Sequence, residues 1–225
     1  LFRSPQPLVD NGVGITGRAD VGDGFRLSYD FFAVAGLQGE GADLDFVVSR
    51  DMTDNNAEPS FTGRLGFGRS AFASGFSFLV GRHDSDSRLS HYAWGLDART
   101  RIGPLSLAFE YASRTTQYES SAGLRTAHQK RAIWGQAGFA VMPGWVQVLV
   151  AADYLAMTGV YLGNAGPRPG ALGAVTDKRN EVYRLTGGVV VTPYSEIVLK
   201  FDIEYWNFSD FTDVWVFQAG AAWSF

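Results

Sequence analysis

Apolar and polar residues alternate along most of the chain, and the pattern is clearest in residues 196–205. The odd positions there are apolar or aromatic, and most even positions are charged: Glu196, Ile197, Leu199, Lys200, Phe201, Asp202, Ile203, Glu204 and Tyr205. Successive side chains of a β-strand point to opposite faces of its sheet. The segment is therefore predicted to be a strand with one apolar and one charged face.

A second strand is predicted over residues 213–225. Trp215, Phe217, Trp223 and Phe225 fall at alternate positions and share one face. Trp223 and Phe225 resemble the C-terminal aromatic signal that the assembly machinery of outer-membrane β-barrels reads. An outer-membrane barrel is thus the leading hypothesis for the fold.

The same period of two recurs upstream, and it predicts about eleven strands in all. Their expected ranges are 12–20, 25–33, 61–67, 76–81, 91–101, 105–114, 133–141, 146–154, 183–191, 196–205 and 213–225. No run approaches the roughly 20 apolar residues that a transmembrane helix needs. The connections after the first, third, fifth, seventh and ninth strands are short. Three others are predicted to be long loops: 37–60, 115–129 and 157–180.

Bacterial barrels combine short periplasmic turns with long outer loops. With the C-terminus in the periplasm, every tight turn of this chain falls on the periplasmic side. The predicted fold class is therefore all-β, an antiparallel transmembrane β-barrel in the bacterial outer membrane. No separate soluble domain is expected within residues 1–225.

Eleven strands are an odd number, whereas an antiparallel sheet closes on itself only with an even number. Residues 1–11 contain Pro5 and Pro7 and cannot supply a twelfth strand, because proline removes ladder donors. An open edge in lipid would leave backbone groups without hydrogen bonds. We therefore expect the chain to be the C-terminal part of a larger barrel, completed by an upstream segment or another chain. A miscounted strand is the alternative.

Several short segments carry a family resemblance. They are PLVDNGVGITG (residues 7–17), FRLSYD (25–30), AVAGL (33–37), Asn55-Asn56, FTGRLGF (61–67) and YAWGLDA (92–98). In outline they resemble a mid-protein region of the phosphate-selective porin (porin O/P-like) family. The resemblance implies a barrel of about 16–18 strands, often trimeric, that passes small anions. It does not extend to the family's arginine and lysine ladder, which cannot be matched residue by residue.

Composition excludes several classes. A hydrophobic content of 46% and a mean hydropathy of −0.04 suit a barrel, whose lipid-facing and lumen-facing residues alternate. The absence of cysteine excludes disulfides, thiolate metal sites and cysteine nucleophiles. A net charge of −4 gives no support to nucleic-acid binding. No cofactor or metal is expected, since Asp43, Asp45 and Asp51 do not match an ordered calcium loop.

The predicted strands place fourteen charged residues on the lumen side. The basic ones are Arg18, Arg26, Arg64, Arg99, Arg101, Arg184 and Lys200; the acidic ones are Asp20, Asp30, Asp97, Glu110, Asp153, Asp202 and Glu204. Rings of charge can set pore selectivity. Alternatively, these residues pair across neighbouring strands and only solvate the wall.

The function expected from this pattern is passive diffusion of small hydrophilic solutes through a porin, with a phosphate-type anion preference as the finer expectation. The expected partners are outer-membrane lipids, the barrel assembly machinery, small solutes or anions, and a homotrimer or larger outer-membrane complex. No catalytic residue is predicted. Three alternatives remain: a scaffold barrel filled by a partner protein, a soluble β-sandwich, and a barrel hydrolase using His83 or His91 with Ser85, Ser87 or Ser90.

Overall fold

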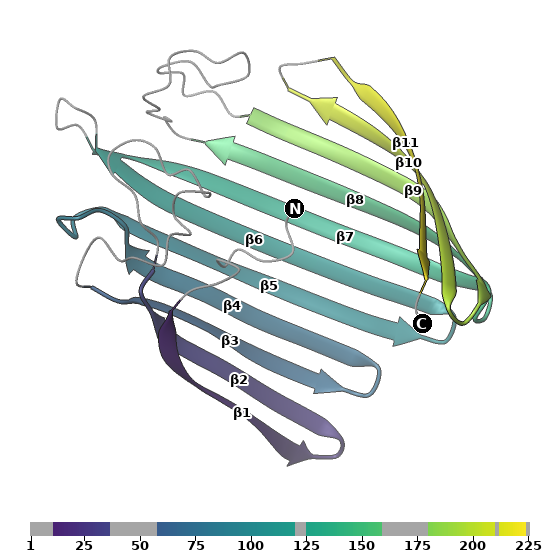
Figure 1. The fold of residues 1–225 in the computed structure, drawn as a ribbon, viewed down its shortest axis with the longest axis horizontal. Helices are drawn as coiled ribbons and strands as arrows, with labels where there is room; N and C mark the ends of the chain where they lie inside the picture. The colour runs from purple at the N-terminus through teal and green to yellow at the C-terminus, as the bar shows by residue number, and fades with distance from the viewer. Residues whose placement is uncertain (1–10, 37–57, 120–124, 159–179, 210–211, 224–225) are drawn as a thin grey trace.

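The computed structural model describes residues 11–36, 58–119, 125–158, 180–209 and 212–223. Eleven strands form one antiparallel sheet in chain order, which confirms the predicted fold class (Figure 1). Their bounds are β1 (Gly12–Gly22), β2 (Phe25–Val34), β3 (Ser60–Arg69), β4 (Phe72–Arg82), β5 (Ser90–Ile102), β6 (Leu105–Glu119), β7 (Arg125–Met142), β8 (Val146–Thr158), β9 (Asn180–Tyr194), β10 (Ile197–Phe208) and β11 (Val214–Trp223). The described ranges contain no helix able to span a membrane.

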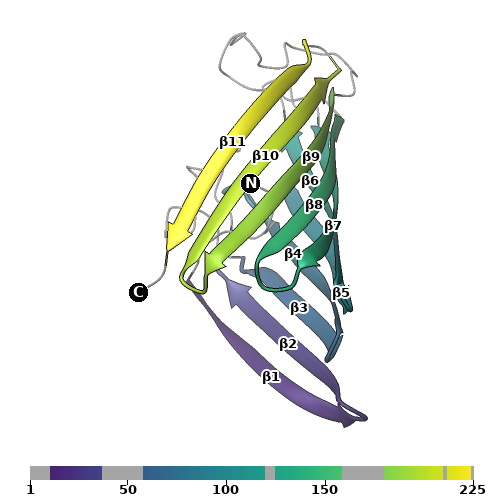
Figure 2. The same ribbon diagram turned by 90° about the vertical axis from the view of Figure 1, so that its right-hand side faces the viewer.

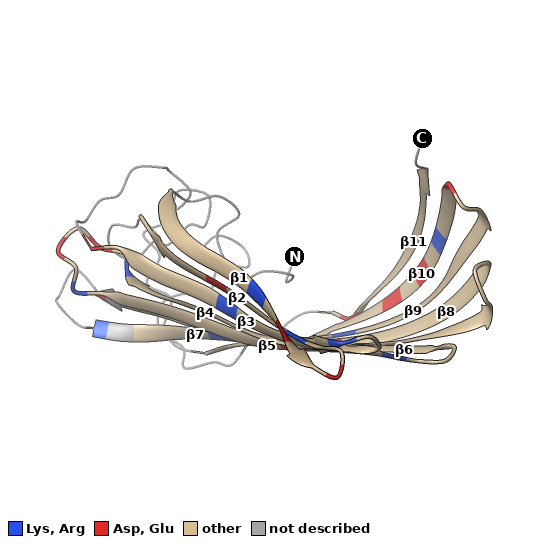
Figure 3. Ribbon diagram, turned by 90° about the horizontal axis from the view of Figure 1, so that it is seen from below, with Lys and Arg blue, Asp and Glu red and all other residues tan. Residues whose placement is uncertain are grey.

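The sheet curls into an open trough with β1 and β11 as its two edges (Figures 2 and 3). Each strand pairs only with its sequence neighbours, so β1 and β11 do not meet in the described sheet. Because every pairing is antiparallel, β1 and β11 run in the same direction. This direction constrains how a barrel containing the sheet can close.

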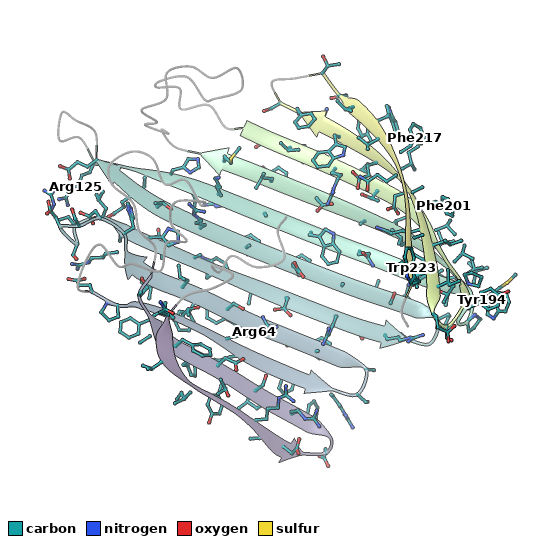
Figure 4. All side chains as sticks on the ribbon, in the orientation of Figure 1. Arg64, Arg125, Tyr194, Phe201, Phe217 and Trp223 are labelled. Carbon is teal, nitrogen blue, oxygen red and sulfur yellow. The ribbon has the colours of Figure 1, made fainter. Side chains whose placement is uncertain are left out.

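Between the two ends of the sheet the convex face is predominantly apolar. Cross-strand partners such as Leu65 and Phe76, or Val150 and Gly187, hold this face in register from strand to strand. Large side chains on it are widely exposed, and Phe201 and Phe217 project away from the trough in Figure 4. Such a face is stable in contact with lipid, not with water.

Two aromatic girdles border the apolar part of the convex face, which we call the apolar belt. Near the end with the long connections, the pairs Trp94–Tyr111, Tyr154–Tyr183 and Tyr205–Trp215 have ring centroids 4.7–4.9 Å apart. Near the end with the short turns lie exposed Trp145, Tyr194 and Trp223. From Ile197 to Tyr205, β10 rises about 26 Å along the strand, enough for a tilted strand to cross much of a bilayer.

The tight turns after β1, β3, β5, β7 and β9 all lie at one end of the trough, as predicted (Figure 1). The turn between β1 and β2 needs left-handed backbone at Gly22 (φ 92°), Asp23 (φ 47°) and Gly24 (φ 75°). Glycine adopts this conformation without steric cost. Of the connections predicted to be long, residues 37–57 and 159–179 lie outside the described residues.

The predicted loop over residues 115–129 is wrong. β6 continues to Glu119 and β7 begins at Arg125, with registered pairs such as Thr116 with His128. The extra residues lie beyond the Tyr111 girdle, where the convex side carries Ser113, Thr115 and Arg131. Outside the apolar belt neither face must be apolar, so the alternation that identifies a membrane strand ends while backbone pairing continues.

The apolar belt generates a stability prediction. Val150 lies on the convex face of β8 and is 57% exposed, whereas Thr186 of β9 lies on the concave face. We expect Val150→Arg to lower the free energy of unfolding by about 2–4 kcal/mol, the cost of an arginine facing mid-bilayer lipid. Thr186→Arg, beside Glu204, should cost far less. Urea unfolding of the protein in lipid vesicles measures both, and equal losses would contradict the assignment of the faces.

Candidate functional site

The concave face carries all fourteen charged residues that the sequence places on the lumen side. The cross-strand pairs Asp20–Arg26, Asp30–Arg64, Asp97–Glu110 and Asp153–Arg184 fix this placement, and the remaining six residues fall in the same phase of their strands: Arg18, Arg99, Arg101, Lys200, Asp202 and Glu204. A role in lining a pore remains a prediction. The concave face is the candidate site because it gathers the chain's charged strand residues.

Arg64 of β3 reaches across β4 to Asp97 of β5. Its Nη1 and Nη2 donate to Asp97 Oδ2 and Oδ1 at 2.6 and 2.9 Å, and Nη1 also donates to Ser77 Oγ at 2.9 Å. The guanidinium lies over Gly75, where a Cβ atom would come within 2.2 Å of Nη2. Glycine at this position therefore makes the bidentate ion pair possible (Figure 4 labels Arg64).

Arg184 of β9 joins three strands. Its Nε and Nη2 donate to Asp153 of β8 at 3.0 and 2.9 Å, and its Nη1 donates to Glu204 of β10 at 3.4 Å. Trp206 Nε1 donates to the second Glu204 oxygen at 2.9 Å, and the Arg184 guanidinium lies 4.9 Å from the Trp206 ring centroid. Both carboxylates are thus held in place, and Glu204 is only 6% exposed.

The structure thus shows that charged residues of the concave face pair across neighbouring strands or along one strand. Lys200 Nζ also lies 2.8 Å from Asp202, and exposed Arg26 lies 3.3 Å from Asp20. These contacts neutralise much of the charge in the middle of the wall. Carboxylates nevertheless outnumber cations there, because Asp30 and Glu110 share this zone with the two arginine clusters.

Near the end with the short turns the balance reverses. Arg18, Arg26, Arg99 and Arg101 line one hollow of about 940 Å³, and we call these four residues the arginine patch. No aspartate or glutamate is among the described residues that line it. Within the described part of the chain, Arg18, Arg99 and Arg101 form no ion pair. Their charge is available to a solute.

The histidines proposed for a hydrolase are closed to substrate. His83 and His91 are 0% and 2% exposed. His83 Nε2 lies 2.9 Å from the Gln117 carbonyl, and His91 Nδ1 lies 2.9 Å from Thr116 Oγ1. The first contact ties the connection between β4 and β5 to β6, and the second ties β5 to β6. A structural role explains this geometry better than a catalytic one.

Sequence reasoning missed the aromatic residues of the concave wall. Trp134 of β7, and Trp206 and Phe208 of β10, fall in the polar phase of their strands. Trp206 and Phe208 stack with centroids 6.0 Å apart. The signal was available: each aromatic residue is out of phase with the apolar positions of its own strand.

The described residues cover only some of the other positions named in the sequence predictions. Trp223 lies on the convex face opposite Ile197, 68% exposed, while Phe225 lies outside the described residues. Asp43, Asp45 and Asp51 also lie outside them. In the part of the chain that is described, no group of three or more His, Asp or Glu side chains could hold a metal ion.

Comparisons with known proteins agree on the architecture. The chain resembles a loop-deletion mutant of OmpT, an outer membrane protein of Vibrio cholerae, with a TM-score of 0.52 and 11% identity over 95% of this chain and 91% of that one. It also resembles two mutants of the ferric enterobactin receptor PfeA of Pseudomonas aeruginosa. Their TM-scores are 0.52 and 0.51 at 9% identity, over 92% of this chain but only 38% and 39% of the receptor. No protein-family model and no curated protein sequence matches the chain.

These likenesses show the fold. The chain has an outer-membrane β-barrel fold, the fold on which the expected location in the bacterial outer membrane rests. An outward-facing apolar belt between two aromatic girdles is typical of that fold, and the chain has both features.

The Arg184 cluster yields a second stability prediction. Arg184→Ala leaves the Asp153 and Glu204 carboxylates without their common cation, and we expect a loss of about 3 kcal/mol in the free energy of unfolding. Arg26→Ala removes an exposed pair and should cost less than about 1 kcal/mol. Unfolding in urea compares the two variants. Similar losses would mean that the Arg184 cluster adds no more than a surface ion pair.

Proposed function

We propose that the protein is a passive outer-membrane channel for small hydrophilic solutes, with a preference for anions. The arginine patch is the observation that carries this proposal. Three of its four arginines, Arg18, Arg99 and Arg101, form no ion pair with the described residues, and arginines gathered around a hollow on the concave wall lower the electrostatic energy of an anion passing them. The finer expectations, phosphate-type selectivity and a homotrimer, rest on the family resemblance of the sequence.

The patch favours a channel over the two alternatives. A barrel filled by a partner protein would require these arginines to be desolvated against it, which is costly unless each meets a carboxylate. The hydrolase alternative lacks an accessible imidazole, and the proposal assigns no catalytic residue. A channel requires neither desolvated arginines nor an accessible imidazole, because solutes and ions reach the patch in water.

We also propose that further strands close the barrel, and that their number is odd. The exposed edges β1 and β11 run in the same direction, so an antiparallel neighbour of each must run the opposite way. Only an odd number of inserted strands satisfies both edges. Five or seven would give the barrel of about 16–18 strands expected from the sequence.

Ion selectivity tests the channel. In planar bilayers under a KCl gradient, the reversal potential of the purified protein should indicate chloride preference. Each arginine changes the energy of an ion 4 Å away by about 1 kcal/mol in water, so Arg99→Gln with Arg101→Gln should lower the chloride-to-potassium permeability ratio severalfold. Arg131→Gln, on the convex face, is the control of equal charge change and should leave the ratio unchanged. Absence of conductance, or an unaltered ratio in the double variant, would overturn the proposal.

Barrel closure is tested by intact mass. We expect the folded protein extracted from membranes in detergent to exceed 24.5 kDa by roughly half again or more, given about ten residues per added strand plus loops. A second polypeptide of fixed stoichiometry that supplies an odd number of strands would satisfy the same requirement. A folded, heat-modifiable barrel of 24.5 kDa alone would refute it.

A further inference from the structure

Trp134 is one of the large side chains of the concave wall that the strand pattern does not explain. It is partly buried on β7, directly opposite Glu110 of β6 and Asp153 of β8. Its indole N–H forms no hydrogen bond with the described residues. A tryptophan in a polar wall would normally be satisfied by a partner or turned towards lipid. Trp134 is neither.

Trp134 begins a row of registered residues that ends at Trp206. Asp153, Arg184 and Trp206 follow it on β8, β9 and β10. With strands about 4.8 Å apart, the backbone positions of the two tryptophans lie about 14 Å from each other across the wall. Between them stand only a carboxylate and a guanidinium.

The polar groups of this row are already fixed. Asp153 and Glu204 accept hydrogen bonds from Arg184, and Glu204 also accepts one from Trp206. A solute that binds here therefore meets side chains whose conformational entropy is already lost, which favours affinity. Trp206 is covered by the Arg184 guanidinium, 4.9 Å from its ring centroid, and no such contact covers Trp134 within the described residues.

The chemistry of the row selects a neutral, hydroxylated solute. Within the row, Asp153 and Arg184 form an ion pair, so the attraction of either group for an added ion is offset by repulsion from its partner. A hydroxyl group both donates and accepts hydrogen bonds. It can donate to the remaining lone pairs of the Asp153 and Glu204 carboxylates without adding charge. The C–H face of a sugar ring supplies the apolar surface that an uncovered indole face packs against.

We propose that Trp134 and the Asp153–Arg184–Glu204 cluster form a saccharide-binding site on the concave wall, with the Trp134 ring as the stacking platform. The site deepens the proposed channel, on which it rests for access of solutes to the wall. It lies apart from the arginine patch, so the same wall would offer one zone for anions and another for neutral sugars.

The test is calorimetric titration of the full-length protein with maltotriose in lauryldimethylamine oxide micelles, a detergent without sugar groups. We expect wild type to bind maltotriose, and Trp134→Ala to weaken binding by about tenfold or more through loss of the stacking face. Trp134→Phe should retain most of the affinity. Trp215→Ala, a tryptophan of the convex face, is the matched control and should bind as wild type does. Choline, an organic cation, should release no heat.

Absence of maltotriose binding by wild type, equal binding by Trp134→Ala, or binding of choline instead would each overturn the site. If Trp134→Ala loses the heat-modifiable folded form, Trp134→Leu replaces it, keeping apolar volume without an aromatic face. Binding in micelles does not require conduction. Saccharide binding without conductance would contradict the channel and leave the site, whereas conductance without binding would contradict the site alone.

Discussion

The structure depends above all on the need of every backbone N–H and C=O group for a partner where water is absent. In lipid only a hydrogen-bonded sheet or helix meets this need, and the sheet chosen here divides its side chains strictly between two environments. The convex positions must be apolar, since they face hydrocarbon. The concave positions are released from that requirement, and the chain places its charged strand residues there. The two girdles mark where the constraint ends, and beyond them β6 and β7 continue as a hairpin that is polar on both faces.

The concave wall divides its charge in a way that ties stability to function. In the middle, Arg64 holds Asp97 of a strand two positions away, and Arg184 holds Asp153 and Glu204, which would otherwise repel one another. These contacts use the charge to cross-brace the sheet. Towards the short turns, Arg18, Arg99 and Arg101 of the arginine patch form no ion pair with the described residues, and they line the hollow. A residue's role thus follows from whether a partner of opposite sign lies within reach, not from its charge alone.

Period-two alternation was sufficient to predict the strands inside the apolar belt, because lipid enforces it residue by residue. It located Ile197 to Tyr205 and the inward phase of all fourteen charged residues. It failed at Thr115 to Gln129, where no lipid enforces the pattern, although the backbone pairs through most of this range. The alternation could not predict side-chain contacts between strands. Arg64 reaches Asp97 across β4 because Gly75 leaves space for its guanidinium. Glu204 accepts hydrogen bonds from both Arg184 and Trp206 because the strand register brings them together. Trp134 was visible in the sequence but lay in the phase assigned to polar residues.

The shared direction of β1 and β11 also bears on how such a barrel can arise. A barrel that lengthens by duplicated hairpins adds strands in pairs, and each addition preserves the up–down order around the ring. An eleven-strand unit does not have this property, since β11 of one repeat would lie beside β1 of the next in parallel. Tandem duplication or symmetric self-assembly of this sheet would therefore place a parallel seam at every junction.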